Sequence, residues 1–120
     1  MFKSSVTEIG ASAISKKDPL IILFGEEATE ELRKVSVIHT VQTEANQVDL
    51  NQAQTVSFDD QVYTIEEVGT LANKNFNSIG HVTLNFSEVP DEKDHRIENA
   101  IYLAPHELPV LKVGTKISIS

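Results

Sequence analysis

The side chains of this sequence that are best suited to chemistry are four histidines, His39, His81, His95 and His106. A neutral imidazole has a free lone pair near neutral pH, because its ordinary pKa is about 6.5. Such a nitrogen can attack a phosphoryl group and carry it as phosphohistidine. The chain contains no cysteine, which excludes disulfides, thiolate metal sites and a cysteine nucleophile. A functional hypothesis therefore rests on histidine.

His39 is the most informative of the four because of the segment that contains it. Residues 35–41 are rich in β-branched residues in alternation, a pattern that predicts a strand. Taken alone, this pattern favours a half-buried structural histidine held by hydrogen bonds. The alternative is a nucleophile on a rigid platform provided by the strand.

The other three histidines lie in segments predicted to be turns or loops. His81 stands at the junction of a predicted helix and a predicted strand, so it is either a turn residue or a second group that orients a phosphoryl group. His95, in the charged segment 90–98, and His106 are interpreted as surface residues. None of the four is spaced as a metal pair on one element, so neither a metal nor another cofactor is expected.

Other catalytic classes find little support in the residue types. The carboxylates fall in predicted turns, loops and a charged helix face, and no pair stands out as an acid and a base. The five glycines form neither a GxGxxG fingerprint nor a phosphate-binding P-loop. A small hydrolase that uses His81 and a carboxylate is a weaker alternative, because no nucleophile motif accompanies them.

The charge balance narrows the class of partner. Ten basic and eighteen acidic residues give a formal net charge of -8, and neither half of the chain is basic. Nucleic acids and anionic membranes require a positive footprint, so neither is expected as a partner, whereas a basic protein face would be attracted. The N-terminus has no apolar signal core and no run is long enough to span a membrane, so the expected location is cytoplasmic.

Short strand-like runs dominate the rest of the chain. The apolar run 20–24, between Pro19 and Gly25, is typical of a strand buried on both faces. Asp59 and Asp60 separate two alternating segments and predict a tight hairpin turn. Strands are predicted at residues 20–24, 35–41, 55–58, 61–65, 82–86, 101–103 and 117–119.

Two short helices interrupt the strands. Residues 26–34 carry four glutamates early and two basic residues at the end, the order that a helix dipole favours. A second helix is predicted to be capped by Thr70 and to end at Gly80. The 120 residues therefore predict one domain, residues 1–120, of the all-β class and mainly antiparallel, as a small barrel or sandwich with one or two short helices.

Four motifs, taken in order, resemble a known family. They are Ile-Gly-Ala-Ser-Ala at residues 9–13, Ile-His at 38–39, Val-Gly-Thr-Leu-Ala at 68–72 and Ile-Gly-His-Val-Thr-Leu-Asn-Phe at 79–86. They are similar to the glucitol/sorbitol-specific IIA component of the bacterial phosphoenolpyruvate:sugar phosphotransferase system (PTS). The resemblance runs from Thr7 to the C-terminus, and the block around His81 is its most specific part.

The resemblance implies a small closed β-barrel and a phosphocarrier. Members of the family accept a phosphoryl group from the protein HPr on a histidine that corresponds to His39. They pass it to the IIB component, and glucitol, sorbitol or a related alditol is phosphorylated during uptake. With this analogy, we hypothesise that His81, Thr40 and Ser36 support the transfer as donors to the phosphoryl oxygens. The resemblance implies no cofactor, and contact with the membrane only through IIB and IIC.

Two turn regions depart from the family pattern. The segment Glu44–Thr55 is rich in Asn and Gln where family members often carry a Pro-Gly turn, and Lys112-Val113-Gly114 replaces a second Pro-Gly. Because recognition of IIB could run through such loops, the identity of the alditol stays open.

A reading from another functional class also stays open. In it the chain is a non-catalytic β-barrel that binds or regulates, and His39 is structural. The sequence likewise leaves open a homodimer formed through an exposed strand edge, and the ring nitrogen that carries the phosphoryl group.

Overall fold

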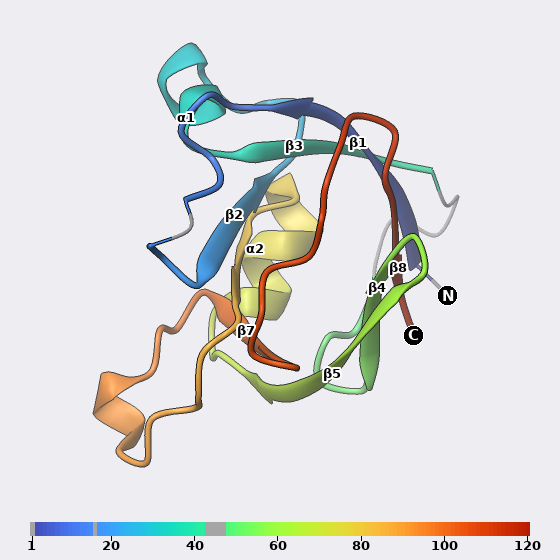
Figure 1. Ribbon diagram of the computed structural model, residues 1–120. Helices are drawn as coiled ribbons and strands as arrows, with labels where there is room; N and C mark the ends of the chain where they lie inside the picture. The colour runs from blue at the N-terminus through green and yellow to red at the C-terminus, as the bar shows by residue number, and fades with distance from the viewer. Residues whose placement is uncertain (1, 16, 43–47) are drawn as a thin grey trace.

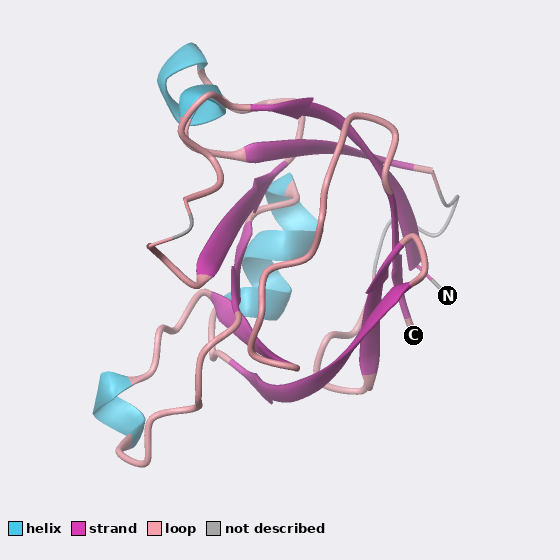
Figure 2. Ribbon diagram, viewed as in Figure 1, coloured by secondary structure: helices cyan, strands magenta, loops and turns pink. Residues whose placement is uncertain are grey.

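The computed structural model describes residues 2–15, 17–42 and 48–120, and its eight strands close into one barrel (Figures 1 and 2). The strands are β1 (Phe2–Ile9), β2 (Leu20–Phe24), β3 (Val37–Val41), β4 (Thr55–Phe58), β5 (Gln61–Val68), β6 (Val82–Asn85), β7 (Ala100–Ala104) and β8 (Lys116–Ile119). Neighbours follow the order β1-β3-β2-β6-β7-β5-β4-β8, and β8 returns to pair with β1. The described strands therefore leave no open sheet edge of the kind invoked for a dimer.

The predicted fold class, a small closed barrel with short helices, is confirmed, although the barrel is mixed. β2 pairs with β3 and β6 pairs with β7 in parallel, whereas the other neighbours are antiparallel. Parallel neighbours require a crossover connection. Each crossover here contains a short helix, α1 (Glu30–Lys34) between β2 and β3, and the 3-10 helix η1 (Lys93–His95) between β6 and β7.

β1 is the strand that the sequence pattern did not predict. It pairs with β3 on one side and with β8 on the other, and its register shifts between Val6 and Glu8. Its side chains do not alternate simply between apolar and polar, because Ser4 and Ser5 are both buried. β1 therefore closes the barrel with polar groups inside the wall.

The helix α1 is shorter than the predicted 26–34. The Thr29 hydroxyl accepts a hydrogen bond from the Leu32 amide and caps the helix at its start. Residues 25–28 form a turn instead, closed by a hydrogen bond from the Ala28 amide to the Gly25 carbonyl. The early glutamates thus belong partly to this turn and partly to the helix.

The second helix, α2 (Ala72–Ile79), ends as predicted but begins differently. Leu71 is its N-cap and provides no side-chain hydrogen bond, so Thr70 is not the cap. Gly80 ends the helix in the left-handed conformation, with φ of 67°. In Figure 1, α2 is seen through the ring of strands. Its buried residues, Ala72 and Phe76, belong to the main core.

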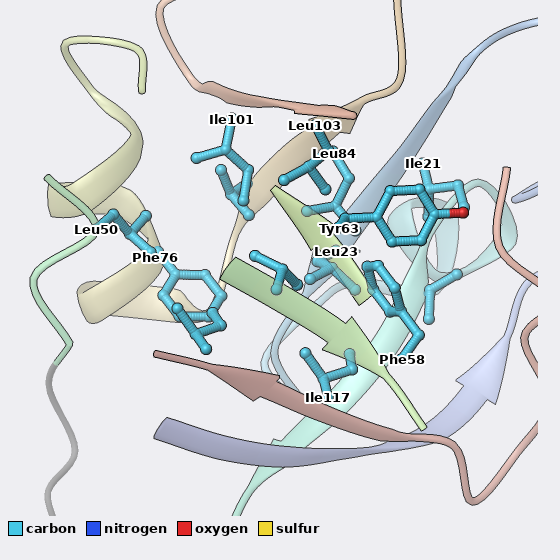
Figure 3. Packing of buried hydrophobic residues seen from close by; sticks show 14 of the residues in the cluster. Ile21, Leu23, Leu50, Phe58, Tyr63, Phe76, Leu84, Ile101, Leu103 and Ile117 are labelled. Atoms are coloured by element: carbon cyan, nitrogen blue, oxygen red, sulfur yellow. The ribbon is translucent and has the colours of Figure 1, made fainter. Parts of the chain in front are cut away.

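The main core fills the barrel interior with large apolar side chains from the strands and from α2. Figure 3 shows Phe76 projecting from α2 toward this core, with Leu50 beside the helix. A second, small cluster of Phe24, Ala28 and Ile38, packed against Ile79, joins the 25–28 turn to the end of α2. No helix in the described ranges is long and apolar enough to cross a membrane.

Candidate functional site

His39 lies on β3 and points into the barrel, where only 1% of its surface is exposed. Its ring stacks against Phe76 of α2, with centroids 5.7 Å apart and an interplanar angle of 18°. β3 alternates as a strand should, so that Val37 enters the same core as His39 and Ile38 enters the second cluster. The histidine is therefore more deeply buried than the sequence predicted.

Both ring nitrogens of His39 have hydrogen-bond partners from distant parts of the chain. Nδ1 lies 2.9 Å from the Ser4 hydroxyl on β1, and Nε2 lies 2.9 Å from the Gly80 carbonyl oxygen. A carbonyl oxygen only accepts, so Nε2 must be the nitrogen that carries the proton. The Ser4 hydroxyl then donates to the lone pair of Nδ1.

Burial keeps His39 in the neutral form. Desolvation lowers the pKa of His39 below its ordinary value of 6.5, and the hydrogen bond to the Gly80 carbonyl offsets part of this effect. A neutral imidazole retains a lone pair, which is the first requirement for a phosphoryl acceptor at neutral pH.

A hollow of about 340 Å³ lies against His39. Its walls come from Phe2 of β1, from the 25–27 turn, from residues 39–41 of β3 and from residues 76–80 at the end of α2. Gly80 belongs to this lining, but Ser4, which is fully buried, does not. The Nε2 edge of the ring therefore faces the hollow, whereas the Nδ1 edge faces the barrel wall.

The 25–28 turn beside the hollow is fixed from outside by one arginine. The Arg33 guanidinium donates to the carbonyl oxygens of Ala28, at 3.0 Å, and of Glu26, and it pairs with Glu8 at 3.1 Å. The Gly25 amide also donates to the Ile79 carbonyl at 2.9 Å. The walls on both sides of His39 are thus tied to each other.

Thr40 and Ser36, the predicted hydroxyl donors, are placed differently. The Thr40 hydroxyl donates to the Glu26 carboxylate at 2.6 Å, and it belongs to the opposite strand face from His39. Thr40 lines the hollow, so it remains next to the site with its proton engaged. Ser36 is buried in the turn before β3, does not line the hollow, and its hydroxyl has no partner among the described residues.

His81 lies next to the site and contacts its wall. Its ring stacks on Phe24, with centroids 4.4 Å apart, and its Nδ1 lies 3.1 Å from the Leu23 carbonyl oxygen. His81 is not part of the hollow's lining. These contacts place it where it holds the neighbouring Gly80 against β2.

The remaining histidines lie outside the strands, do not line the hollow beside His39, and pair with glutamates. His95 is exposed and lies 3.5 Å from Glu92, and His106 lies 2.8 Å from Glu66. A hollow of about 380 Å³ between residues 67–70 and 93–98 is lined by none of the four histidines. Within the described ranges, no three His, Asp or Glu side chains gather as a metal site would require.

Sequence reasoning missed two partners of the candidate nucleophile, Ser4 and the Gly80 carbonyl. Ser4 lies 35 positions from His39 on a strand that was not predicted, so no local pattern could connect them. Gly80 was predicted as the end of a helix, a role that it has, but a backbone carbonyl leaves no trace in residue type.

Comparison with known proteins places the chain in a family. A family model described as the PTS system glucitol/sorbitol-specific IIA component matches residues 1–118. The chain belongs to this family. The glucitol/sorbitol IIA assignment makes it a phosphotransferase component with a phosphocarrier role in sugar transport.

Two relatives of this IIA component agree with the assignment. The PTS system glucitol/sorbitol-specific EIIA component of Escherichia coli strain K12 is 33% identical over 87 residues, which cover 72% of this chain and 69% of that protein. The crystal structure of a PTS system IIA component from Enterococcus faecalis V583 is 43% identical, covers 97% of both chains and superposes with a TM-score of 0.90.

Proposed function

We propose that His39 is the residue that carries the phosphoryl group, received from HPr and passed to the IIB component during uptake of glucitol, sorbitol or a related alditol. The observation that carries the proposal is the neutral imidazole of His39 with its Nε2 edge against a hollow at the barrel wall. In a phosphotransferase component without cysteine, such a histidine is the natural acceptor.

The chemistry demands little beyond positioning. The bond between phosphorus and the donor's ring nitrogen breaks as a bond between phosphorus and a His39 nitrogen forms, with both nitrogens in line. Strand β3, the Phe76 ring and two hydrogen bonds fix the orientation of the acceptor ring. Holding the acceptor in place lowers the entropic cost of such a reaction.

The charge of the molecule supports docking against a basic partner. Glu26 and Glu27 line the hollow, and the whole chain has a formal net charge of -8. Complementary charge speeds encounter and orients the partner, while the complex stays short-lived enough for turnover. The proposal includes a cytoplasmic location, with contact to the membrane only through the IIB and IIC components.

A second candidate function rests on the burial of His39. A ring that is 1% exposed, with both nitrogens hydrogen-bonded, also fits a structural histidine in a barrel that only binds or regulates. In that case no phosphoryl group would be transferred to it.

An assay of intact mass separates the two functions. The purified protein is incubated with phosphoenolpyruvate, enzyme I and HPr, beside a His39→Gln variant and a His106→Gln control. We expect one base-stable, acid-labile phosphoryl group on the wild type and on the control, and none on His39→Gln. A folded wild-type protein that gains no mass, while HPr is shown to be phosphorylated, would favour the non-catalytic function.

A further inference from the structure

The Ser4 hydroxyl is held in place by two strands and meets the buried nitrogen of His39. Ser4 pairs with Val41 of β3 on one side and with Ile117 of β8 on the other, so its backbone is fixed at the seam of the barrel. Its side chain is fully buried, and its hydroxyl lies 2.9 Å from Nδ1. A buried polar group in so rigid a place is suited to positioning another group.

The two partners of the His39 ring differ in what they can do. The Gly80 carbonyl only accepts a hydrogen bond, whereas a serine hydroxyl both donates and accepts. In the arrangement described, the proton is therefore on Nε2, the nitrogen that faces the hollow. The lone pair is on Nδ1, where the barrel wall and Ser4 exclude a partner protein.

This arrangement has the proton on the wrong nitrogen for a reaction at the hollow. Attack from Nε2 requires a lone pair there, so the ring exchanges protons with solvent: Nδ1 takes up one proton and Nε2 releases one into the hollow, with no net change in charge. The contact from Nε2 to Gly80 must open, because the phosphoryl group takes its place. After this exchange, the Ser4 hydroxyl can accept from Nδ1–H without any movement of the ring.

We propose that Ser4 is a positioning residue for phosphoryl transfer at His39: its hydroxyl donates to Nδ1 in the free protein and accepts from Nδ1–H when Nε2 attacks. This inference rests on the proposed function of His39. The hydroxyl reverses its role while the ring keeps its place, so the tautomer changes without loss of orientation.

The step balances in atoms and charge. A donor phosphohistidine that is protonated on its free nitrogen loses its phosphorus–nitrogen bond and departs as a neutral imidazole. The lone pair of Nε2 forms the new bond to phosphorus, and Nδ1–H of His39 becomes the proton of a cationic ring. The Ser4 oxygen, as acceptor, stabilises the charge that develops at Nδ1.

The first test compares three variants in transfer from phosphorylated HPr. Ser4→Ala is expected to slow acceptance by about 10- to 100-fold, the scale of a lost positioning contact, with phosphorylation still reaching completion. Ser4→Thr keeps the hydroxyl and should retain most of the wild-type rate. Ser5→Ala is the matched control. Ser5 is buried on the same strand, but its hydroxyl accepts a hydrogen bond from Lys116 Nζ at 2.8 Å and not from His39.

Two outcomes would overturn the role of Ser4. One is a Ser4→Ala variant that accepts phosphoryl groups at the wild-type rate. The other is a folded Ser4→Thr variant as slow as Ser4→Ala, which would show that the hydroxyl itself is not required. Thermal unfolding of each variant verifies that the barrel is intact.

A second measurement needs no variant. Nitrogen-15 NMR of the wild-type ring should show the proton on Nε2 in the free protein and the phosphoryl group on Nε2 after reaction. A phosphoryl group on Nδ1 would displace Ser4 and end the proposal, while the phosphocarrier function would stand. A wild-type protein that is never phosphorylated would instead end the proposed function.

Discussion

In the proposed function, the imidazole of His39 is reached by another protein, although the ring is almost completely buried. The nitrogen on the side of the hollow, Nε2, is hydrogen-bonded to a backbone carbonyl at the end of a helix. A carbonyl at a glycine hinge can move aside with a change of a few backbone angles. In the proposed function, access to Nε2 would therefore depend on Gly80.

Burial of His39 has a consequence for stability against pH. The pKa of His39 is lowered in the folded protein, while the unfolded chain has the ordinary value of 6.5. As the pH falls below 6.5, the unfolded chain binds a proton that the folded protein does not, so the free energy of unfolding decreases toward the folded pKa. Above 6.5 this contribution is constant.

Urea unfolding of the wild type and of His39→Gln across this pH range measures the effect. The difference in unfolding free energy between the two proteins should shrink as the pH falls below 6.5, because only the wild type has this titration. A difference that stays constant with pH would contradict the buried, neutral histidine.

Gly80 and Gly114 form a matched pair for testing the contact at Nε2. Both have positive φ, 67° and 98°, so alanine at either position is strained by about 1–3 kcal/mol. A Cβ at Gly80 would also lie 3.0 Å from Nε2 of His39 and 3.1 Å from Gly25, whereas a Cβ at Gly114 meets nothing within 4 Å.

We therefore expect both Gly80→Ala and Gly114→Ala to lower thermal stability, but only Gly80→Ala to slow phosphorylation of His39. The rate of transfer from HPr, measured on folded samples, distinguishes them. Equal rates for the two variants would show that Gly80 serves the backbone alone.

At the scale of elements, α2 binds the chain that leads from β3 to β4. The Asn77 side chain accepts a hydrogen bond from the Val48 amide at 2.8 Å and donates one to the Val48 carbonyl at 2.7 Å. The Asn73 side chain accepts a hydrogen bond from the Leu50 amide at 2.8 Å. Two asparagines one turn apart thus hold the backbone of Val48 and Leu50 against the helix.

Asn77→Ala should lower the free energy of unfolding by about 1–3 kcal/mol, because it leaves partly buried backbone groups of Val48 unpaired. Ser78→Ala is the control from the same helix, since its exposed hydroxyl bonds only the Lys74 carbonyl, and it should change stability by less than about 0.5 kcal/mol. Urea unfolding measures both. A cost for Asn77→Ala no larger than that of the control would contradict this role.

Most elements could be predicted because their signals are local. The apolar run at 20–24, the hairpin at Asp59-Asp60 and the glycine after α2 each specify an element within a few residues. β1 was not predicted because its buried positions include Ser4, and sequence patterns assign a serine to the surface. The parallel pairs β2–β3 and β6–β7 were not predicted because they depend on which strands the crossovers bring together.

In the candidate site, the histidine could be predicted from local signals, whereas its hydrogen-bond partners could not. His39 could be singled out from residue type, strand pattern and family motif, and its place beside a hollow fits that choice. Its partners could not, since Ser4 and Gly80 reach it only when the barrel forms. The role of the atypical segment Glu44–Thr55 is explained only in part. The backbone of Val48 and Leu50 hydrogen-bonds to asparagines of α2, while residues 43–47 lie outside the described residues.

At the scale of the whole molecule, the net charge of -8 predicts how partner docking depends on salt. Exposed charges are screened over about 8 Å at physiological ionic strength, so attraction to a basic face weakens as salt is added. The second-order rate of transfer from HPr should fall with ionic strength, and a Glu26→Gln, Glu27→Gln double variant should show a smaller fall. A rate that does not change with salt would contradict electrostatic docking at this rim.

The pairing of β1 with β8 also sets the time at which the protein can become a barrel. Residues 2–5 leave the ribosome before their partners at 116–119, which lie more than 110 positions further along the chain. At ordinary rates of translation the interval is on the order of ten seconds. During that time one side of β1 and the core that it covers stay open to solvent. In a nascent chain that pauses before residue 116, β1 therefore has no β8 to pair with, and the barrel is not closed.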